Sequence, residues 1–219
     1  MIGDSGCRIK GAELQDCSDT DAAWPFGRVA AATRPDLVIH VGDYHYRESP
    51  CPADRACRES PWGYGWDAWQ ADYFAPAAPL LAAAPWVMVR GNHEECNRAG
   101  QGWSRLLAPE RYSAQRSCDD PANDEVADFS PPYAVPLGGD TQLLVFDSAH
   151  AGNARLKPGV RQDDLILANY RAEMNELAAL SERPGMRSWF VSHHPVLAFA
   201  PDEHRPKAPY PGNQALQAA

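Results

Sequence analysis

Three short apolar runs, each ending at a loop with polar side chains, constrain the fold of this chain more than any other feature. The runs and the polar residues after them are 37–41 before Asp43, 86–89 before Asn92 and His93, and 189–191 before His193 and His194. Continuous apolar runs of this length are typical of strands buried on both faces in an α/β protein. Ligands bind at the carboxyl ends of such strands, so the pattern predicts a polar site there.

The rest of the chain supports one α/β domain covering residues 1–219. A fourth apolar run at 142–146 leads to Asp147, and 133–135 before it is expected to pair with it. Residues 163–180 carry apolar side chains at helical spacing, which predicts a helix packed on the sheet. Weaker helical patterns cover 21–33 and 66–74, and a long loop rich in Pro, Cys and Gly covers 47–65.

The composition of the chain limits the kinds of molecule that it is expected to bind. The 219 residues are 44% hydrophobic and 22% charged, which is typical of a globular domain rather than a disordered chain. The net charge of −9 disfavours extended nucleic acid, although a small phosphorylated substrate is compatible with it where bound metal supplies a positive field. No run approaches the ~18 apolar residues of a membrane span, so no membrane partner is expected. The oligomeric state has no signal in the sequence.

The six cysteines form an even set in loop-like sequence, and none belongs to a CxxC pair. We expect them to pair locally, because each pair then closes a short loop, although this is one of 15 possible connectivities. Disulfides favour a periplasmic or secreted location over the cytoplasm, with a targeting segment removed or absent from this sequence. The expected pairs are Cys7–Cys17, Cys51–Cys57 and Cys96–Cys118.

Oxygen and imidazole donors gather at the predicted strand ends. Hard metal ions prefer carboxylate, phenolate, amide and imidazole donors, and two ions about 3.5–4 Å apart can clamp a phosphoryl group and activate water. The donors are Asp4, Asp43, Tyr46, Asn92 and His193.

Four motifs then resemble those of calcineurin-type metallophosphoesterases, in the family's order. They are GDSG at 3–6, GDYHY at 42–46, GNHE at 91–94 and FVSHHP at 190–195, resembling GDxG, GDxxY, GNH(E/D) and the histidine motif. Gly6 stands where nucleases and Ser/Thr phosphatases of the superfamily carry histidine, and Tyr46 follows. This combination resembles the purple-acid-phosphatase branch. The resemblance implies a β-sandwich flanked by helices.

The resemblance also implies two metal ions, iron with zinc, manganese or a second iron. Asp4 and Tyr46 would hold the first ion, Asp43 would bridge, and Asn92 and His193 would hold the second.

The implied activity is hydrolysis of phosphate esters, with small phosphomonoesters favoured as substrates. A metal-bound hydroxide would attack the phosphorus atom. His93 would be a catalytic imidazole that contacts the phosphoryl oxygen or protonates the departing alkoxide.

Other interpretations of these residues stay open. Asp4 and Asp43 have the spacing of turn or cap residues after strands. Tyr46 has an alternative role in packing against the aromatic loop 62–69. Either His193 or His194 could be the ligand, and the order in HHP favours His193.

Weaker candidates surround the motifs. His194, His45 and Arg47 are candidates for substrate contact. Asp147 either orients a metal ligand or satisfies local backbone donors.

The sequence departs from the family at its end. The family expects a later GHxH motif with one histidine for each metal, and no Gly-His dipeptide occurs; His204 is the only histidine after His194. We therefore expect a copy truncated at both ends, lacking terminal strands, with weakened metal binding and low activity unless His204 or a partner chain supplies a donor. The alternatives to a phosphomonoesterase are a weak or inactive metal-binding scaffold, a phosphodiesterase or nucleotide pyrophosphatase, and, less favoured, a nuclease.

Overall fold

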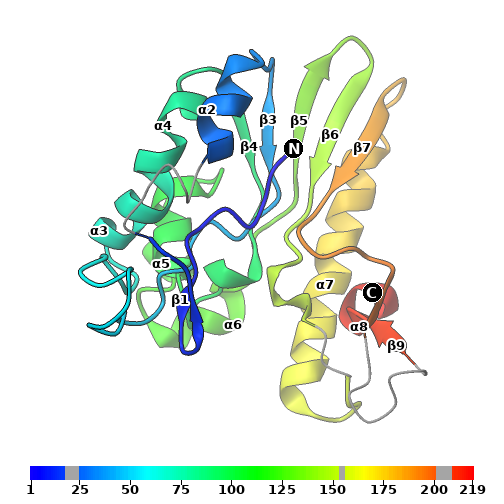
Figure 1. Cartoon of the computed structure of the whole chain (residues 1–219). Helices are drawn as coiled ribbons and strands as arrows, with labels where there is room; N and C mark the ends of the chain where they lie inside the picture. The colour runs from blue at the N-terminus through cyan, green and yellow to red at the C-terminus, as the bar shows by residue number, and fades with distance from the viewer. Residues whose placement is uncertain (18–24, 153–155, 201–208) are drawn as a thin grey trace.

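The computed structural model describes residues 1–17, 25–152, 156–200 and 209–219, and it has a mixed α/β architecture (Figure 1). The predicted fold class is confirmed. Its strands are β1 Ile9–Lys10, β2 Glu13–Leu14, β3 Val38–His40, β4 Trp86–Met88, β5 Tyr133–Gly138, β6 Thr141–Val145, β7 Arg187–Val191, β8 Ala198–Ala200 and β9 Tyr210–Gly212. Its α-helices are α2 Pro25–Ala32, α3 Trp66–Trp69, α4 Ala75–Leu81, α5 Gly100–Gly102, α6 Asp124–Ala127, α7 Arg161–Ser181 and α8 Gln214–Ala218.

Two sheets occupy the centre of the molecule. β3 and β4 are parallel, and Ile2 adds one parallel bridge to His40 ahead of them. In the other sheet, β5 is antiparallel to β6, and β6 is parallel to β7. The predicted pairing of 133–135 with the fourth apolar run is therefore confirmed.

One apolar core joins the two sheets. Val87 of β4 and Val89 just after it pack with Leu143 and Val145 of β6 and with Val191 of β7. Because side chains alternate along a strand, these same-parity residues define a single face of each sheet. The two faces are therefore packed against each other as a sandwich.

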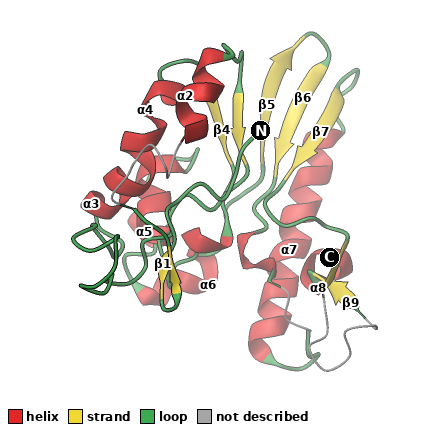
Figure 2. Ribbon diagram, viewed as in Figure 1, coloured by secondary structure: helices red, strands yellow, loops and turns green. Residues whose placement is uncertain are grey.

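Helices cover the outer faces (Figure 2). On the β3–β4 side, Tyr44, Trp69 and Tyr73 form a buried aromatic cluster with Met88 packed against it. On the other side, α7 packs its Tyr170 near Phe146. The predicted helix at 163–180 is confirmed as α7. The pattern at 66–74 is α3 followed by a π-helical turn, Gln70–Phe74, and the pattern at 21–33 is α2 in its described part.

Three disulfides fasten the N-terminal half of the chain. They link Cys7 to Cys17, Cys51 to Cys57 and Cys96 to Cys118, with Cα–Cα distances of 5.8, 5.7 and 4.8 Å. The predicted connectivity is confirmed. Within the described ranges, no helix is both long enough and apolar enough to cross a membrane.

Candidate metal centre

Two aspartates on neighbouring loops adopt a conformation that is uncommon outside glycine. Asp4 follows the bridge residue Ile2 and has φ 53°, and Asp43 follows β3 and has φ 59°. Backbone hydrogen bonds hold the loops together, with 3.0 Å from Asp4 N to Gly42 O and 3.0 Å from Ser5 N to Asp43 O. Left-handed conformations of this kind cluster at functional sites, where the surrounding structure enforces them.

Tyr46 joins the two aspartates in a first donor group. Its hydroxyl oxygen lies 2.8 Å from Asp4 Oδ1 and 2.9 Å from Asp43 Oδ2. Burial, followed by the charge of Asp43 and the hydrogen bond to Asp4, raises the pKa of Tyr46 well above its ordinary value. One phenol proton serves two carboxylates here, so a cation would satisfy this cluster better than the proton does.

His193 forms a second donor group with Asn92. Its Nδ1 lies 2.7 Å from the carbonyl oxygen of Val41, so Nδ1 carries the proton and donates it. The electron pair of Nε2 then faces Asn92 Oδ1 at 3.0 Å and Asp43 Oδ1 at 3.5 Å. Three acceptor atoms face one another, an arrangement that fits a bound cation. A metal-ligating histidine commonly donates its other N–H to a carbonyl in this way.

Asp43 stands between the two groups. Its Oδ2 faces Tyr46, and its Oδ1 faces His193 and also accepts the backbone N–H of His93 at 2.9 Å. One carboxylate therefore has an oxygen in each donor group, as a bridging ligand requires.

Glycines leave the space that these side chains need. A Cβ on Gly91 would lie 2.2 Å from the backbone N of Asp43, so the loops meet only because that side chain is absent. A Cβ on Gly6 would lie 2.7 Å from Tyr46 Cδ2 and 2.7 Å from Asp72 Oδ2. Gly6 is therefore what lets the ring of Tyr46 reach the aspartates.

Two buried carboxylates, Glu94 and Asp72, hold the donor loops in place by accepting backbone N–H groups. The sequence analysis predicted this role for neither residue. Glu94 of the GNHE motif accepts backbone N–H groups from Asp43 at 3.0 Å, Tyr44 at 2.8 Å and Gly91 at 3.1 Å. Burial raises the pKa of Glu94, and these N–H groups oppose that shift.

Asp72 lies in the π-helical turn after α3. It accepts the backbone N–H groups of Cys7 and Tyr46, both at 2.6 Å, and Nε of Arg47 at 3.1 Å. Burial raises its pKa to about 6, against the opposing charge of Arg47. No local sequence signal marks Asp72, whereas Glu94 could have been found as the last residue of a motif.

His93 lies beside the donors and faces an open cavity. Its ring centroid is 3.9 Å from that of Tyr46, and its Nε2 is 3.8 Å from Asp43 Oδ2. Glu48 Oε1 lies 2.9 Å from its Nδ1, and the Arg98 guanidinium contacts both Glu48 and the imidazole. Burial opposes ionisation of Glu48, but hydrogen bonds from His93, Arg98 and Lys10 lower its pKa overall. The cavity has a volume of about 360 Å³ and is lined by Arg8, Lys10, Glu13, Tyr46, Asn92, His93 and Arg98.

The structure does not bring His45 or Arg47 to this cavity, which corrects the expectation of substrate contact. The His45 ring is buried between Tyr64 and Trp69, with centroids 5.7 and 5.4 Å away. Burial lowers the pKa of His45 to about 4. Arg47 is drawn inward by its buried ion pair with Asp72.

The structure bears on two alternatives left open by the sequence, namely the packing role of Tyr46 and the choice between His193 and His194 as a ligand. The ring of Tyr46 lies against His93 and Arg8, not in the 62–69 loop. His194 directs its Nδ1 to Ser148 O at 2.8 Å, while its ring centroid stays 4.6 Å from that of His193. Burial lowers the pKa of His194.

In the described part of the chain, neither Asp147 nor His204 is seen to contact the two donor groups. Asp147 accepts the backbone N–H groups of Ser130 and Ala149, both at 2.9 Å, so it satisfies local donors. His204 lies outside the described residues.

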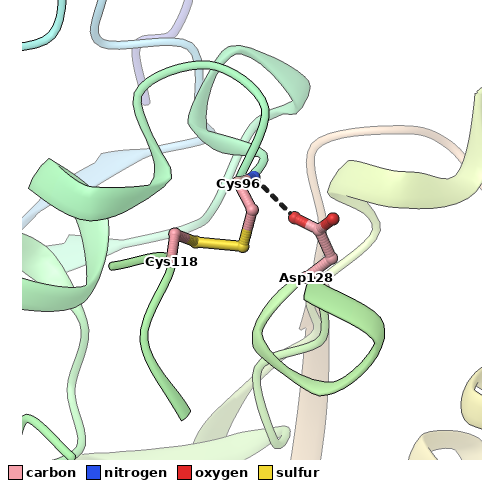
Figure 3. Close-up of side chains that lie close together, drawn as sticks. All are labelled: Cys96, Cys118 and Asp128. Carbon is pink, nitrogen blue, oxygen red and sulfur yellow. Dashed lines mark hydrogen bonds between the residues drawn. A yellow bond between two sulfur atoms is a disulfide. The ribbon is translucent and has the colours of Figure 1, made fainter. Parts of the chain in front are cut away.

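Cys96, Cys118 and Asp128 also lie close together, but they are not a metal site (Figure 3). The two sulfurs are bonded to each other, so neither is available as a thiolate ligand. Asp128 Oδ1 accepts the backbone N–H of Cys96 at 2.6 Å, which fastens the disulfide loop to the end of α6.

Comparison with protein families gives a match over nearly the whole chain. The family model described as calcineurin-like phosphoesterase matches residues 2–216, a segment that includes both donor groups. No curated protein matches the chain.

Proposed function

The chain belongs to the calcineurin-like phosphoesterase family, and on that premise we propose that it hydrolyses small phosphomonoesters at a dinuclear metal centre. Members of this family are metal-dependent hydrolases of phosphate esters that generally bind two divalent ions, so this chain is a hydrolase of that kind. The substrate preference, the ligand assignment and the identity of the metals are the proposed part.

The observation that carries the ligand assignment is the position of Asp43. Its two carboxylate oxygens face two different donor groups, so one residue can serve two ions. Asp4 and Tyr46 complete the first group, and Asn92 and His193 complete the second.

Bound ions would supply positive charge that polarises the phosphoryl group and lowers the pKa of water. The protein's own contribution is to hold the donors in left-handed loops and to present His93 at the cavity wall. From there its imidazole can donate to a phosphoryl oxygen or to the departing alkoxide. Asp43, Glu48 and Arg98 surround the ring and hold its position at the cavity wall.

Gly6 and Tyr46 favour the purple-acid-phosphatase-like branch and iron at the first position. A histidine at position 6 would occupy the space of the Tyr46 ring. A tyrosine ligand at position 46 therefore requires a glycine at position 6. Phenolate oxygen suits ferric iron, while the amide and imidazole donors of the second group accept zinc, manganese or iron.

The test is hydrolysis of p-nitrophenyl phosphate and of its bis-ester by protein loaded with iron, zinc or manganese, with metal content measured on the same samples. We expect the monoester to be cleaved faster. Asp43→Asn should lose bound metal and turnover together. Turnover that survives metal removal would contradict the assignment, and faster cleavage of the bis-ester would make the protein a phosphodiesterase.

A metal-binding scaffold is the second candidate, because each donor group gathers three protein ligands and leaves coordination positions open. It predicts stoichiometric metal binding without release of p-nitrophenol under any metal condition.

The disulfides support a proposed periplasmic or secreted location, since such links persist in oxidising compartments.

A further inference from the structure

Two cationic side chains lie beside the candidate metal centre, Lys10 in β1 and Arg8 just before that strand. Arg8 and Lys10 are exposed, while Ile9 between them is fully buried. Because side chains alternate along extended backbone, the two cations share the face opposite Ile9. Both line the same cavity as Tyr46 and His93.

The strand is held against the loop that carries Tyr46. Ile9 N donates to Tyr46 O at 3.0 Å, and Glu48 N donates to Ile9 O at 3.0 Å. The Cys7–Cys17 disulfide closes the segment on either side of β1 and β2. The Arg8 guanidinium carbon lies 4.9 Å from the Tyr46 ring centroid. The cations are therefore placed relative to the donors by backbone contacts.

Arg98 supplies a third cation, and in the described part of the chain the three cations share two ion-paired carboxylates. Glu48 is shared among Lys10 at 3.1 Å, Arg98 and the imidazole of His93. Glu13 faces Arg8 at 3.5 Å, but both side chains are largely exposed, and exposed pairs of this kind are weak. Among the described residues, three permanent cations thus form ion pairs with two carboxylates, in a chain whose net charge is −9. The charge of Asp4, which belongs to the first donor group, also acts on Arg8.

We propose that Arg8, Lys10 and Arg98 bind a second phosphate group on the same substrate molecule, and that the preferred substrates are small bisphosphorylated compounds. This inference rests on the proposed function, in which the first phosphate would bind at the metal ions held by the two donor groups. The cavity of about 360 Å³ suits a small molecule, and the negative charge of the whole chain disfavours a long polyanion.

The test uses a matched pair of non-hydrolysable probes, propylphosphonate and the bisphosphonate with one phosphonate at each end of the same three-carbon chain. Calorimetry measures the dissociation constant of each probe with manganese-loaded protein. We expect the bisphosphonate to bind at least about tenfold more tightly, because charged hydrogen bonds contribute on this scale. Added sodium chloride should reduce that preference by screening exposed charges.

Variants then locate the second phosphate. Lys10→Gln and Arg8→Gln should each reduce the ratio of the two dissociation constants about three- to tenfold. Arg183→Gln removes an exposed charge in the turn after α7 and should leave the ratio unchanged. Equal binding of the two probes by the wild type, or an unchanged ratio in both Lys10→Gln and Arg8→Gln, would overturn the inference.

Turnover of p-nitrophenyl phosphate, measured on the same preparations, separates this inference from the proposed function. Hydrolysis without a bisphosphonate preference leaves the proposed function standing and rejects the second phosphate site. A preference without hydrolysis supports the second site and rejects the catalytic proposal.

Discussion

Gly6 shows how a missing side chain can position a candidate metal donor. Its Cβ position lies 2.7 Å from Tyr46 Cδ2, closer than packed atoms approach. We therefore predict that Gly6→Ala displaces Tyr46, lowers metal affinity about tenfold and destabilises the fold by ~1–3 kcal/mol. Metal titration and urea unfolding measure the two effects. Gly65→Ala is the control, since a Cβ there meets nothing within 4 Å.

Binding of ferric iron by Tyr46 would be visible in the absorption spectrum. If its phenolate oxygen binds ferric iron, the oxidised protein absorbs visible light, and Tyr46→Phe removes that band. Tyr133→Phe removes a hydroxyl that donates to Met88 O, away from the cluster, and should keep it. Absorption spectra normalised to iron content check this. A colourless wild-type protein with bound iron would contradict a phenolate ligand.

The sequence could nominate the members of the two donor groups because each belongs to a short contiguous motif, and the structure brings these motifs together. The residues that position these donors could not be predicted. Asp72 reaches Tyr46 and Cys7 across 26 and 65 positions, and Arg98 reaches Glu48 across 50. A single charged residue has no periodicity that reveals a partner so distant in the sequence. Arg47 was mistaken for a substrate contact for the same reason.

At the scale of elements, the apolar runs predicted β3, β4 and β6, because burial on both faces leaves a continuous pattern. The run at 189–191 also forms a strand, β7, but the expected burial is wrong there, since Trp189 and Phe190 are exposed. The run at 37–41 contains β3, and the run at 142–146 overlaps β6. The hairpin of β1 and β2 was not predicted, since two-residue strands are too short to show alternation. The π-helical turn Gln70–Phe74 was equally hidden, because its composition is that of an ordinary helix.

The helix α7 carries a buried acid that makes stability depend on pH. Neither carboxylate oxygen of Glu173 has a hydrogen-bond partner among the described residues. Burial, reinforced by the charge of Asp147, raises its pKa from 4.5 to about 10. The folded state therefore holds this proton more tightly than the unfolded state, and stability falls as pH rises from 4.5 towards 10.

We predict that Glu173→Gln reduces this loss, by on the order of 3 kcal/mol at about pH 8. Urea unfolding of both proteins at about pH 5 and pH 8 measures it. Glu182→Gln, at the exposed C-terminal end of α7, should behave as wild type. Parallel pH profiles for wild type and Glu173→Gln would show that Glu173 is ionised in the fold.

Across the whole molecule, the disulfides are unevenly placed. All three lie between residues 7 and 118, beside the loops that carry Asp4, Asp43 and Asn92. Reduction should therefore loosen the part that carries Asp4, Asp43 and Asn92 before the part containing β5, β6 and α7.

A pair of double variants separates stability from site geometry. Cys7→Ser/Cys17→Ser and Cys51→Ser/Cys57→Ser open loops with sequence separations of 10 and 6. Each should lower the free energy of unfolding by roughly 2–4 kcal/mol. Only the first should weaken the bisphosphonate preference, because only that loop carries Arg8 and Lys10. Calorimetry with both probes checks this, and equal preferences in the two variants would count against the hairpin's role.

The donor groups draw on both sheets of the sandwich, since His193 follows β7 whereas Asp43 follows β3 and Asn92 follows β4. An ion held by all three would act as a crosslink, and its binding energy would include the energy of keeping the sheets in register. Thermodynamic linkage then works in both directions. A cavity made in the shared core by Val145→Ala, a residue that belongs to neither donor group, should raise the dissociation constant of the ion. Metal affinity in this protein would then report on how well its two layers fit together.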